Sequence, residues 1–381
     1  MPISAPVPVS TAPGLVLFGL LGSALGLGAA GRATMAAARA AGIPFSLVDL
    51  EAPEQAVPAR PVNLLHVNPN ILITLLQRRQ FPSAGLLRDR FNIGYWVFEA
   101  PDFLPSGWAQ AIPLVHEIWT PSTFAAAAIA PLVPVPVVPI PHCVAPAAGA
   151  YDRAALGLEP GTFVFLFVFD AGSTVQRKNP EGVLRAFVTA FPDPADRVRL
   201  VLKTRGLPDE GVRQWHRALA GRTDVRIINE TWDPARTHAL IAACDCYVSL
   251  HRAEGFGLTI AEAMYFGKPV IATGYSGNLD FTLLHNSYLV PSRPTLLDRP
   301  SGLLPAGLQW VEPDIPMAAA LMRRVLDRPS EAAGIGARAA AHLREKFSPQ
   351  AVGARMAARL ALLRRTGRIG PETDREPAAW A

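Results

Sequence analysis

The chain has 381 residues, of which half are hydrophobic and 18% are charged. This length and apolar content predict two domains and exclude intrinsic disorder for most of the chain. The three cysteines are too few for a disulfide scaffold and too scattered for a four-ligand zinc site, which predicts a reducing, cytoplasmic location. The net charge of +5 suits anionic partners, but no run of basic residues indicates a nucleic-acid site.

Residues 14–31, GLVLFGLLGSALGLGAAG, are apolar enough to suggest a signal peptide or a membrane span. No positive charge precedes them, they contain six glycines, and their apolar run is short for a span of about 20 residues. We therefore predict a strand over residues 15–20, a glycine-rich turn and a helix over residues 29–41. A membrane span is the alternative.

Short apolar runs alternate with helical patterns along most of the chain, which is typical of parallel α/β sheets. The first series is LVLFGL, FSLVDL, VNLLHV, NIGYWVF and HEIWT, and the second is FVFLFVFD, VRLVLKT, VRIINE, CYVSL, PVIATG and SYLV. Between them, residues 131–160 are rich in proline, which cannot enter the interior of a sheet, so we predict a domain crossing there. The predicted parts are two Rossmann-like domains, a crossing helix and a mobile tail, over residues 1–145, 146–347, 348–368 and 369–381.

Glycines and carboxylates are densest in residues 246–280, CYVSLHRAEGFGLTIAEAMYFGKPVIATGYSGNLD. An apolar strand leads into a loop that contains Glu254 and two glycines, and a helix is predicted from Leu258 to Phe266. The unpaired N–H groups and positive dipole of such a helix start suit a phosphate or diphosphate. Glu262 lies about one turn inside the helix, where a carboxylate can accept hydrogen bonds from ribose hydroxyls. The alternative is that both glutamates are solvated surface charges.

The string EGFGLTIAE, followed by AMYFGKPVIAT, resembles the donor site of retaining GT-B glycosyltransferases of the GT4 family. SLHRAEG, GYSGNLDF, NIGYWVFEAPDF, HEIWTPSTF and FDAGSTVQRKNPEGVLRAF are similar to a bacterial branch of that family associated with surface polysaccharides. The resemblance spans residues 15–355. It implies an α/β GT-B fold of two facing Rossmann-like domains with a cleft between them and a C-terminal helix that crosses back. It also implies transfer of a hexose from a nucleotide sugar to a glycan or lipid-linked acceptor, in the cytoplasm or peripherally at the inner membrane.

The resemblance implies roles for individual residues of the donor domain. Glu254 would lie against the donor sugar and Glu262 would bind the ribose hydroxyls. The backbone amides of the intervening loop would approach the sugar and the diphosphate; these belong to Gly255, Phe256, Gly257 and Leu258. His251 directly follows the strand CYVSL, so it is expected to line the donor pocket, a capping contact being the alternative.

Departure of a nucleoside diphosphate develops negative charge, so a cation must be fixed beside it in advance. The family places an arginine and a lysine after the first strand of the second domain, where this chain has Phe169-Asp170 and carries its basic pair later, as Arg177-Lys178. Lys178 matches the family lysine, and the arginine role passes to Arg177 or is shared with Lys203, for which an edge-strand charge is the alternative. No Asp-x-Asp pair is present to hold a metal, so we expect neither a metal nor another cofactor. An ordinary solvated turn at Arg177-Lys178 is the alternative.

The N-terminal domain is expected to bind the acceptor. Gly28 would allow a sugar to approach the backbone, and His66, Trp96 and Glu99 follow or end strands, where they would line the cleft or instead serve the packing. Glycines at 26, 28 and 31 also fit G-x-G-x-x-G with an acidic residue, Asp49, eighteen residues beyond. An NAD-dependent enzyme is therefore a second hypothesis, and a carbohydrate-binding protein without catalysis is a third.

Overall fold

The computed structural model describes residues 12–22, 26–52, 57, 59–82, 84–194, 197–219 and 221–370. The described residues form two compact units. The first comprises the described residues up to Val144 together with those from Glu345 on, and the second comprises Ala145–Arg344. The end of the predicted tail, from residue 371 on, lies outside the described residues.

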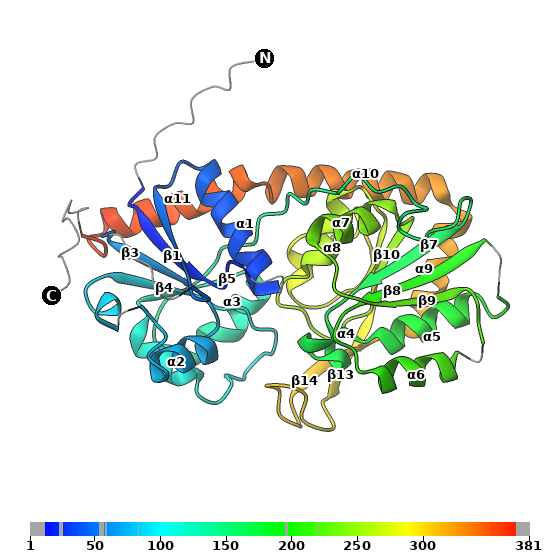
Figure 1. Ribbon diagram of the computed structural model, residues 1–381, viewed down its shortest axis with the longest axis horizontal. Helices are drawn as coiled ribbons and strands as arrows, with labels where there is room; N and C mark the ends of the chain where they lie inside the picture. Colours follow the sequence, from blue (N-terminus) through cyan, green and yellow to red (C-terminus); the bar gives the residue numbers. More distant parts are fainter. Residues whose placement is uncertain are drawn as a thin grey trace, which may run out of the picture. The chain divides into compact units, whose positions relative to one another are not determined.

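The first unit is built on a six-stranded parallel sheet with the order β2-β1-β3-β4-β5-β6. Its helices are α1, α2, α3 and α11, and in Figure 1 α1 and α11 lie on one side of the sheet and α2 and α3 on the other. Between these elements lie 3-10 turns over Ala84–Leu87, Trp108–Leu114 and Ala130–Leu132. The bounds are β1 Leu15–Gly19, β2 Phe45–Asp49, β3 Val62–His66, β4 Phe91–Tyr95, β5 Glu117–Thr120, β6 Val137–Pro139, α1 Gly26–Ala40, α2 Pro69–Gln77, α3 Thr123–Ile129 and α11 Pro349–Arg365.

The proline-rich segment after residue 131 departs in part from the prediction. Val137–Pro139 forms β6, which pairs only with β5 at the edge of the first sheet, where a missing N–H is tolerated. The boundary between the two units follows at Val144. The early prolines therefore complete the first sheet, and only the later residues of the segment begin the second unit.

The last helix packs in the first unit. Val352, Met356, Leu360 and Leu363 of α11 are buried in the same core as the first sheet. α11 approaches α1 so closely that a Cβ added at Gly353 would lie 2.2 Å from the carbonyl oxygen of Ala37. Glycine is therefore required at this crossing.

The second unit holds another six-stranded parallel sheet, with the order β12-β11-β10-β7-β8-β9, and an antiparallel hairpin of β13 and β14. Figure 1 shows α7 and α8 on one side of this sheet and α5 and α6 on the other. The strands are β7 Phe163–Val168, β8 Val198–Thr204, β9 Val225–Asn229, β10 Cys246–Ser249, β11 Val270–Thr273, β12 Tyr288–Val290, β13 Ser292–Leu296 and β14 Gln309–Pro313. The helices are α4 Val175–Lys178, α5 Pro180–Ala190, α6 Asp209–Ala218, α7 Pro234–Ala243, α8 Leu258–Tyr265, α9 Ile315–Asp327 and α10 Pro329–Lys346, with 3-10 turns over Ala171–Ser173 and Gly277–Asp280.

None of the helices within the described ranges is both long and apolar enough to cross a membrane. The segment that suggested a span instead forms strand β1 and helix α1, with residues 23–25 outside the described set. The predicted helix begins earlier than expected, at Gly26, so Gly28 lies in its first turn rather than in a loop.

Candidate active site

The order in which the chain adds strands to the second sheet reverses between β7 and β10. From β7 the chain moves outward to β8 and β9, and then returns to β10 on the other side of β7. Loops that leave two such neighbouring strands diverge, and ligands of doubly wound folds bind outside the carboxyl ends at this switch point. The segment after β7 carries Arg177 and Lys178, and the segment after β10 carries Glu254. The topology therefore brings the predicted cations and the first predicted glutamate together.

Glu254 forms ion pairs with both cations. Lys178 Nζ donates to Glu254 Oε1 at 2.5 Å, and Arg177 Nη1 lies 3.4 Å from Glu254 Oε2. The Glu254 side chain is only 9% exposed. Burial opposes its ionisation, but the nearby charges of Lys178 and then Arg177 outweigh this and lower the pKa of Glu254 to about 2. Glu254 is therefore a fixed carboxylate between two fixed cations.

The two cations differ in how they are held. Arg177 donates from Nη1 to the Ala253 carbonyl at 2.9 Å and from Nη2 to the Ser173 carbonyl at 3.1 Å, and its side chain is 8% exposed. Lys178 is more accessible, with 18% of its side chain exposed. Arg177 therefore organises the two loops, whereas Lys178 has N–H groups to offer a ligand.

Asn179 connects the segments after β7 and β10, and sequence reasoning missed it. It adopts a positive φ of 55° and caps α5 by accepting from Gly182 N, while its Nδ2 donates to the Leu250 carbonyl at 2.7 Å. The residue before a helix-starting proline is a common cap position, so the string KNP carried the signal for the cap. Its second contact, 71 residues away, could not be read from local sequence.

Helix α8 begins directly after Gly257, whose φ of 96° suits glycine. Gly257 has no side chain to cap this helix start, so the first N–H groups of α8 lie at the positive end of its dipole without a side-chain cap. The preceding loop packs against a second one, because Gly277 N donates to the Glu254 carbonyl and Glu254 N donates to Ser276 Oγ. The amides predicted to approach the diphosphate, those of Gly255, Phe256, Gly257 and Leu258, thus belong to a fixed loop.

His251 lies under this loop and is fully buried. Its Nε2 lies 3.0 Å from Asn278 Oδ1 and 3.2 Å from the Tyr275 carbonyl, so Nε2 carries the proton. Ser249 Oγ lies 3.0 Å from Nδ1 and donates to it. Burial lowers the pKa of His251, which agrees with a neutral ring. His251 therefore tethers two loops of the site, and its contact with the donor stays a prediction.

Glu262 lies in α8, and its carboxylate faces α7. His238 Nε2 lies 3.4 Å from Glu262 Oε1, and the side chain of Glu262 is 16% exposed. The ribose-binding role of Glu262 stays a prediction.

Lys203 lies in a separate group at the ends of β8 and β9. Its Nζ donates to the carbonyls of Thr204 at 2.9 Å and Glu230 at 2.5 Å, and it lies 5.0 Å from the ring centre of Trp232. Burial lowers the pKa of Lys203 to about 8. Its charge is thus engaged by backbone carbonyls. Another cation at this sheet end, Arg205, forms an ion pair with Asp170 at 2.6 Å, and sequence reasoning did not single it out.

The predicted acceptor residues lie in the first unit. In its sheet, the order in which the chain adds strands reverses between β1 and β3. His66 is the last residue of β3 and pairs in register with Gly19 of β1. His66 is buried, stacks on Tyr95 at 4.3 Å, and its ring nitrogens have no hydrogen-bond partner among the residues with assigned positions. Trp96 is 1% exposed and packs edge-on against Trp108, whereas Glu99 is partly exposed. Gly28 is buried inside α1.

The glycines that suggested a dinucleotide fingerprint do not form one. Gly26, Gly28 and Gly31 all lie inside α1, and residues 20–25 separate this helix from β1. In the fingerprint, the first glycine makes the tight turn directly after the strand. The structure therefore removes the geometric basis of the NAD hypothesis.

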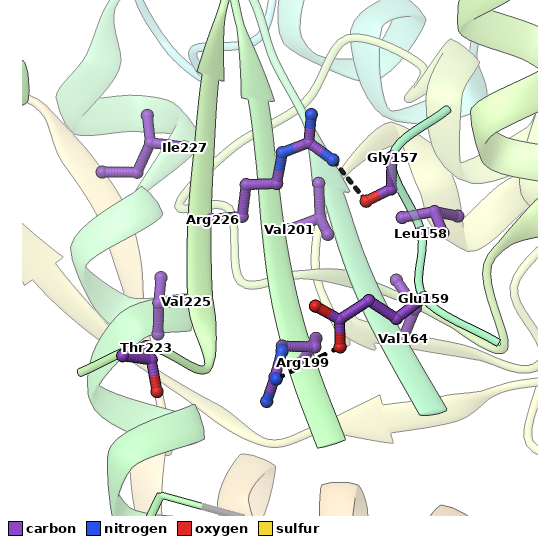
Figure 2. A pocket seen from close by; sticks show the side chains of 10 residues that line it. All are labelled: Gly157, Leu158, Glu159, Val164, Arg199, Val201, Thr223, Val225, Arg226 and Ile227. Atoms are coloured by element: carbon purple, nitrogen blue, oxygen red, sulfur yellow. Dashed lines mark hydrogen bonds and ion pairs between the residues drawn. The ribbon is translucent and has the colours of Figure 1, made fainter. Parts of the chain in front are cut away.

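A pocket in the second unit lies apart from the predicted site. Figure 2 shows it between residues 157–159 and side chains from the first halves of β7, β8 and β9. Arg199 pairs with Glu159 at 3.3 Å, and Arg226 Nη1 donates to the Gly157 carbonyl at 2.5 Å. The ion pairs of Glu254 with Arg177 and Lys178 lie beyond the carboxyl ends of the strands, whereas this pocket lies along their first halves. The pocket is therefore not the candidate active site.

Residues 152–293 match the family model of the glycosyl transferases group 1. The chain has the GT-B fold. The matched part carries Arg177, Lys178, Glu254 and Glu262, so the predicted resemblance is confirmed at the level of group 1 for this part. The chain has no significant sequence match among curated proteins.

Solved structures with the GT-B fold share the architecture over most of this chain. HepE from Anabaena, crystallised with UDP and glucose, is 14% identical with a TM-score of 0.64, over 92% of this chain and all of that one. Sucrose-phosphate synthase from Thermosynechococcus elongatus is 15% identical with a TM-score of 0.65, over 93% of this chain and 99% of that one. The pneumococcal O-GlcNAc transferase GtfA, with UDP and GlcNAc, is 14% identical with a TM-score of 0.55, over 79% of this chain and 56% of that one. At these identities the likeness shows the fold alone.

Proposed function

We propose that the protein is a retaining glycosyltransferase of the GT4 type that moves a hexose from a nucleoside diphosphate sugar to a glycan or lipid-linked acceptor. One observation carries the proposal: Lys178, Arg177 and Glu254 form a fixed charged group beside the uncapped start of α8, at the switch point of the sheet. A departing diphosphate needs such preorganised positive groups. The match of residues 152–293 to the glycosyl transferases group 1 supports this reaction class.

The donor would lie along the start of α8. The N–H groups after Gly257 and the Lys178 ammonium would bind the diphosphate, and Glu262 would accept hydrogen bonds from the ribose hydroxyls. Glu254 would face the sugar. HepE binds UDP and glucose and GtfA binds UDP and GlcNAc, as their structures are described, which makes a UDP-hexose the first donor to test.

The state of Glu254 supports departure and attack on the same face of the sugar. A double displacement requires a carboxylate nucleophile beside the anomeric carbon. The charge of Glu254 is neutralised by two cations, and its low pKa of about 2 marks it as a weak nucleophile. In the proposed step the bond from the anomeric carbon to the diphosphate oxygen breaks, the acceptor oxygen forms a bond on the same face, and the acceptor proton passes to the leaving diphosphate.

The wider setting of the reaction follows from the predicted resemblance. We propose that the enzyme acts without a metal in surface polysaccharide synthesis, in the cytoplasm or peripherally at the inner membrane. The basic chain supports a contact with an anionic membrane surface, because excess Lys and Arg are attracted to it.

A donor screen tests the proposal. Thermal shift with UDP-glucose, UDP-GlcNAc, GDP-mannose, ADP-glucose and NADH should show stabilisation by at least one nucleotide sugar and none by NADH. NMR of the sugar released by slow hydrolysis of that donor should show the anomeric configuration of the donor. Stabilisation by NADH alone would overturn the proposal, as would an absence of hydrolysis and transfer with every sugar.

A further inference from the structure

His238 connects two segments of the second unit. It lies in α7, where its Nδ1 is 3.1 Å from the carbonyl oxygen of Ala147, and its Nε2 is 3.4 Å from Glu262 Oε1 in α8. The Ala147 segment is itself fixed to α7, because Gly149 N donates to the Ala235 carbonyl at 3.0 Å. The imidazole thus joins the first residues of this unit to the glutamate that the proposed function assigns to the ribose.

The two partners of His238 dictate its protonation state. A carbonyl oxygen can only accept, so the Nδ1 that faces Ala147 must carry a proton. A carboxylate also only accepts, so the Nε2 that faces Glu262 must carry a second proton. Either neutral tautomer would place a lone pair against an oxygen lone pair. The contacts therefore select the imidazolium, which forms an ion pair with the carboxylate.

The surroundings of His238 favour this charge. Burial lowers its pKa, but the hydrogen bond and the charge of Glu262, together with the Ala147 carbonyl, outweigh burial and raise the pKa above 6.5. Directly after α8, the uncharged ring of Phe266 lies 6.4 Å from the ring centre of His238. The segment 145–149, APAAG, has no ionisable side chain. In α7 itself, Arg236 stacks on Trp232 at 3.8 Å.

We propose that His238 is a positioning residue whose imidazolium holds the Glu262 carboxylate in the orientation that accepts the donor's ribose hydroxyls. The inference rests on the proposed function. One carboxylate oxygen faces the imidazolium, which leaves the other oxygen for the ligand. As the pH rises through the pKa of His238, the ring loses one of its two N–H protons and no longer donates to both partners. The ion pair that restrains Glu262 is lost, so donor binding weakens on the alkaline side.

Two matched variants separate the contacts of His238. His238→Gln keeps an uncharged N–H near the position of Nε2, and His238→Asn keeps one near the position of Nδ1. Calorimetry with UDP between pH 6 and pH 9 should show affinity falling with pH more steeply for the wild type than for His238→Gln. Near pH 6.5, His238→Asn should bind between about threefold and tenfold more weakly than the wild type, the loss expected for a hydrogen bond to a charged group that keeps some solvent access. The diphosphate titrates equally in all three proteins, so it cancels in the comparison.

A measurement without ligand separates this inference from the proposed function. In the full chain with isotope-labelled histidine, the ring resonances absent from His238→Gln belong to His238. Their titration should give a pKa above 6.5 in the wild type and a lower one in Glu262→Gln. An unchanged pKa in Glu262→Gln, or equal pH dependence of UDP binding in wild type and His238→Gln, overturns the role of His238. Failure of every nucleotide to bind, with the titration as expected, contradicts the proposed function and leaves the His238 to Glu262 coupling established.

Discussion

Lys178 Nζ lies 2.5 Å from Glu254 Oε1, although the two residues are 76 positions apart in the sequence. The contact joins the segments after β7 and β10, the two strands that flank the switch point of the second sheet. An ammonium group has three N–H donors, so one bond to Glu254 leaves two for phosphate oxygens. Glu254 thereby positions the cation before any ligand arrives. A cation positioned in advance needs no reorganisation when the leaving group develops charge.

Lys178→Ala should mainly lower turnover. The lost cation stabilises charge that develops at the leaving diphosphate, and removal of one such preorganised donor typically lowers kcat by about 10²–10³. KM for the nucleotide sugar should change less. Lys178→Arg is the matched control, because it keeps the charge but not the compact geometry, and it should retain more activity than alanine. Wild-type turnover in Lys178→Ala would remove Lys178 from the site.

Glu262→Ala should weaken donor binding more than it lowers turnover, because the ribose is remote from the reacting bond. The expected rise in KM for the nucleotide sugar is roughly tenfold or more, as for hydrogen bonds to a charged group. Glu262→Gln keeps an accepting oxygen, so its KM should lie between those of the wild type and Glu262→Ala. A donor that lacks the ribose hydroxyls should bind wild type and Glu262→Ala equally, and a persistent difference with that donor would contradict the assignment.

Activity should survive EDTA. The positive groups at the candidate site are side chains and backbone N–H groups. Within the ranges that the structure describes, no three His, Cys, Asp or Glu residues gather as a metal site. Initial rates with and without excess EDTA test this directly. Loss of activity that Mg²⁺ or Mn²⁺ restores would contradict the metal-free proposal.

The sequence predicted the parallel sheets from local patterns, whereas it offered the cations of the candidate site through the resemblance to a family. Buried parallel strands are continuous apolar runs, and the loops after them hold the polar residues. Glu254 was named from the loop after such a strand, and Lys178 and Arg177 were named from the resemblance, before their contacts were known. The helix was expected from Leu258 to Phe266, and α8 runs from Leu258 to Tyr265 directly after Gly257.

Contacts between distant segments could not be predicted in the same way. Lys203 lies near the end of a strand, but neighbouring carbonyls and Trp232 engage its charge, and this depends on how β8 and β9 pair. The hairpin of β13 and β14 was missed because its first strand contains Pro294 and polar residues, and it lacks the apolar run used to find strands. The start of α1 was placed late because glycines weaken a helical pattern.

Glu254 should make the folded state sensitive to acid. Its pKa is about 2 in the folded protein against an ordinary value of 4.5, so the stabilisation is present above pH 4.5 and is lost as the pH falls towards 2. The shift corresponds to about 3 kcal/mol. Urea unfolding at pH 7 and pH 3 should show a larger loss of stability in the wild type than in Glu254→Gln, which has no carboxylate to protonate.

A matched carboxylate separates Glu254 from general acid effects. Glu159 is an exposed partner of Arg199, with 66% of its side chain accessible, and exposed pairs contribute little. Glu159→Gln should therefore lose stability between pH 7 and pH 3 by the same amount as the wild type. Equal acid losses in Glu254→Gln and the wild type would show that Glu254 is not held as an ion pair in solution.

Arg359→Ala should destabilise the first unit. Arg359 of α11 donates from Nε and Nη2 to the two oxygens of Glu117 at 2.9 Å and 2.5 Å, and Glu117 is fully buried at the start of β5. Removing the guanidinium leaves a buried carboxylate whose remaining side-chain donor, among the described residues, is the indole N–H of Trp119 at 2.7 Å. Breaking a buried pair in this way costs about 3–5 kcal/mol. Denaturant unfolding should show this loss, and Glu117→Gln introduced with Arg359→Ala should recover part of it, because the amide removes the uncompensated charge. A loss below about 1 kcal/mol in Arg359→Ala, the range of an exposed pair, would show that the interaction does not anchor α11.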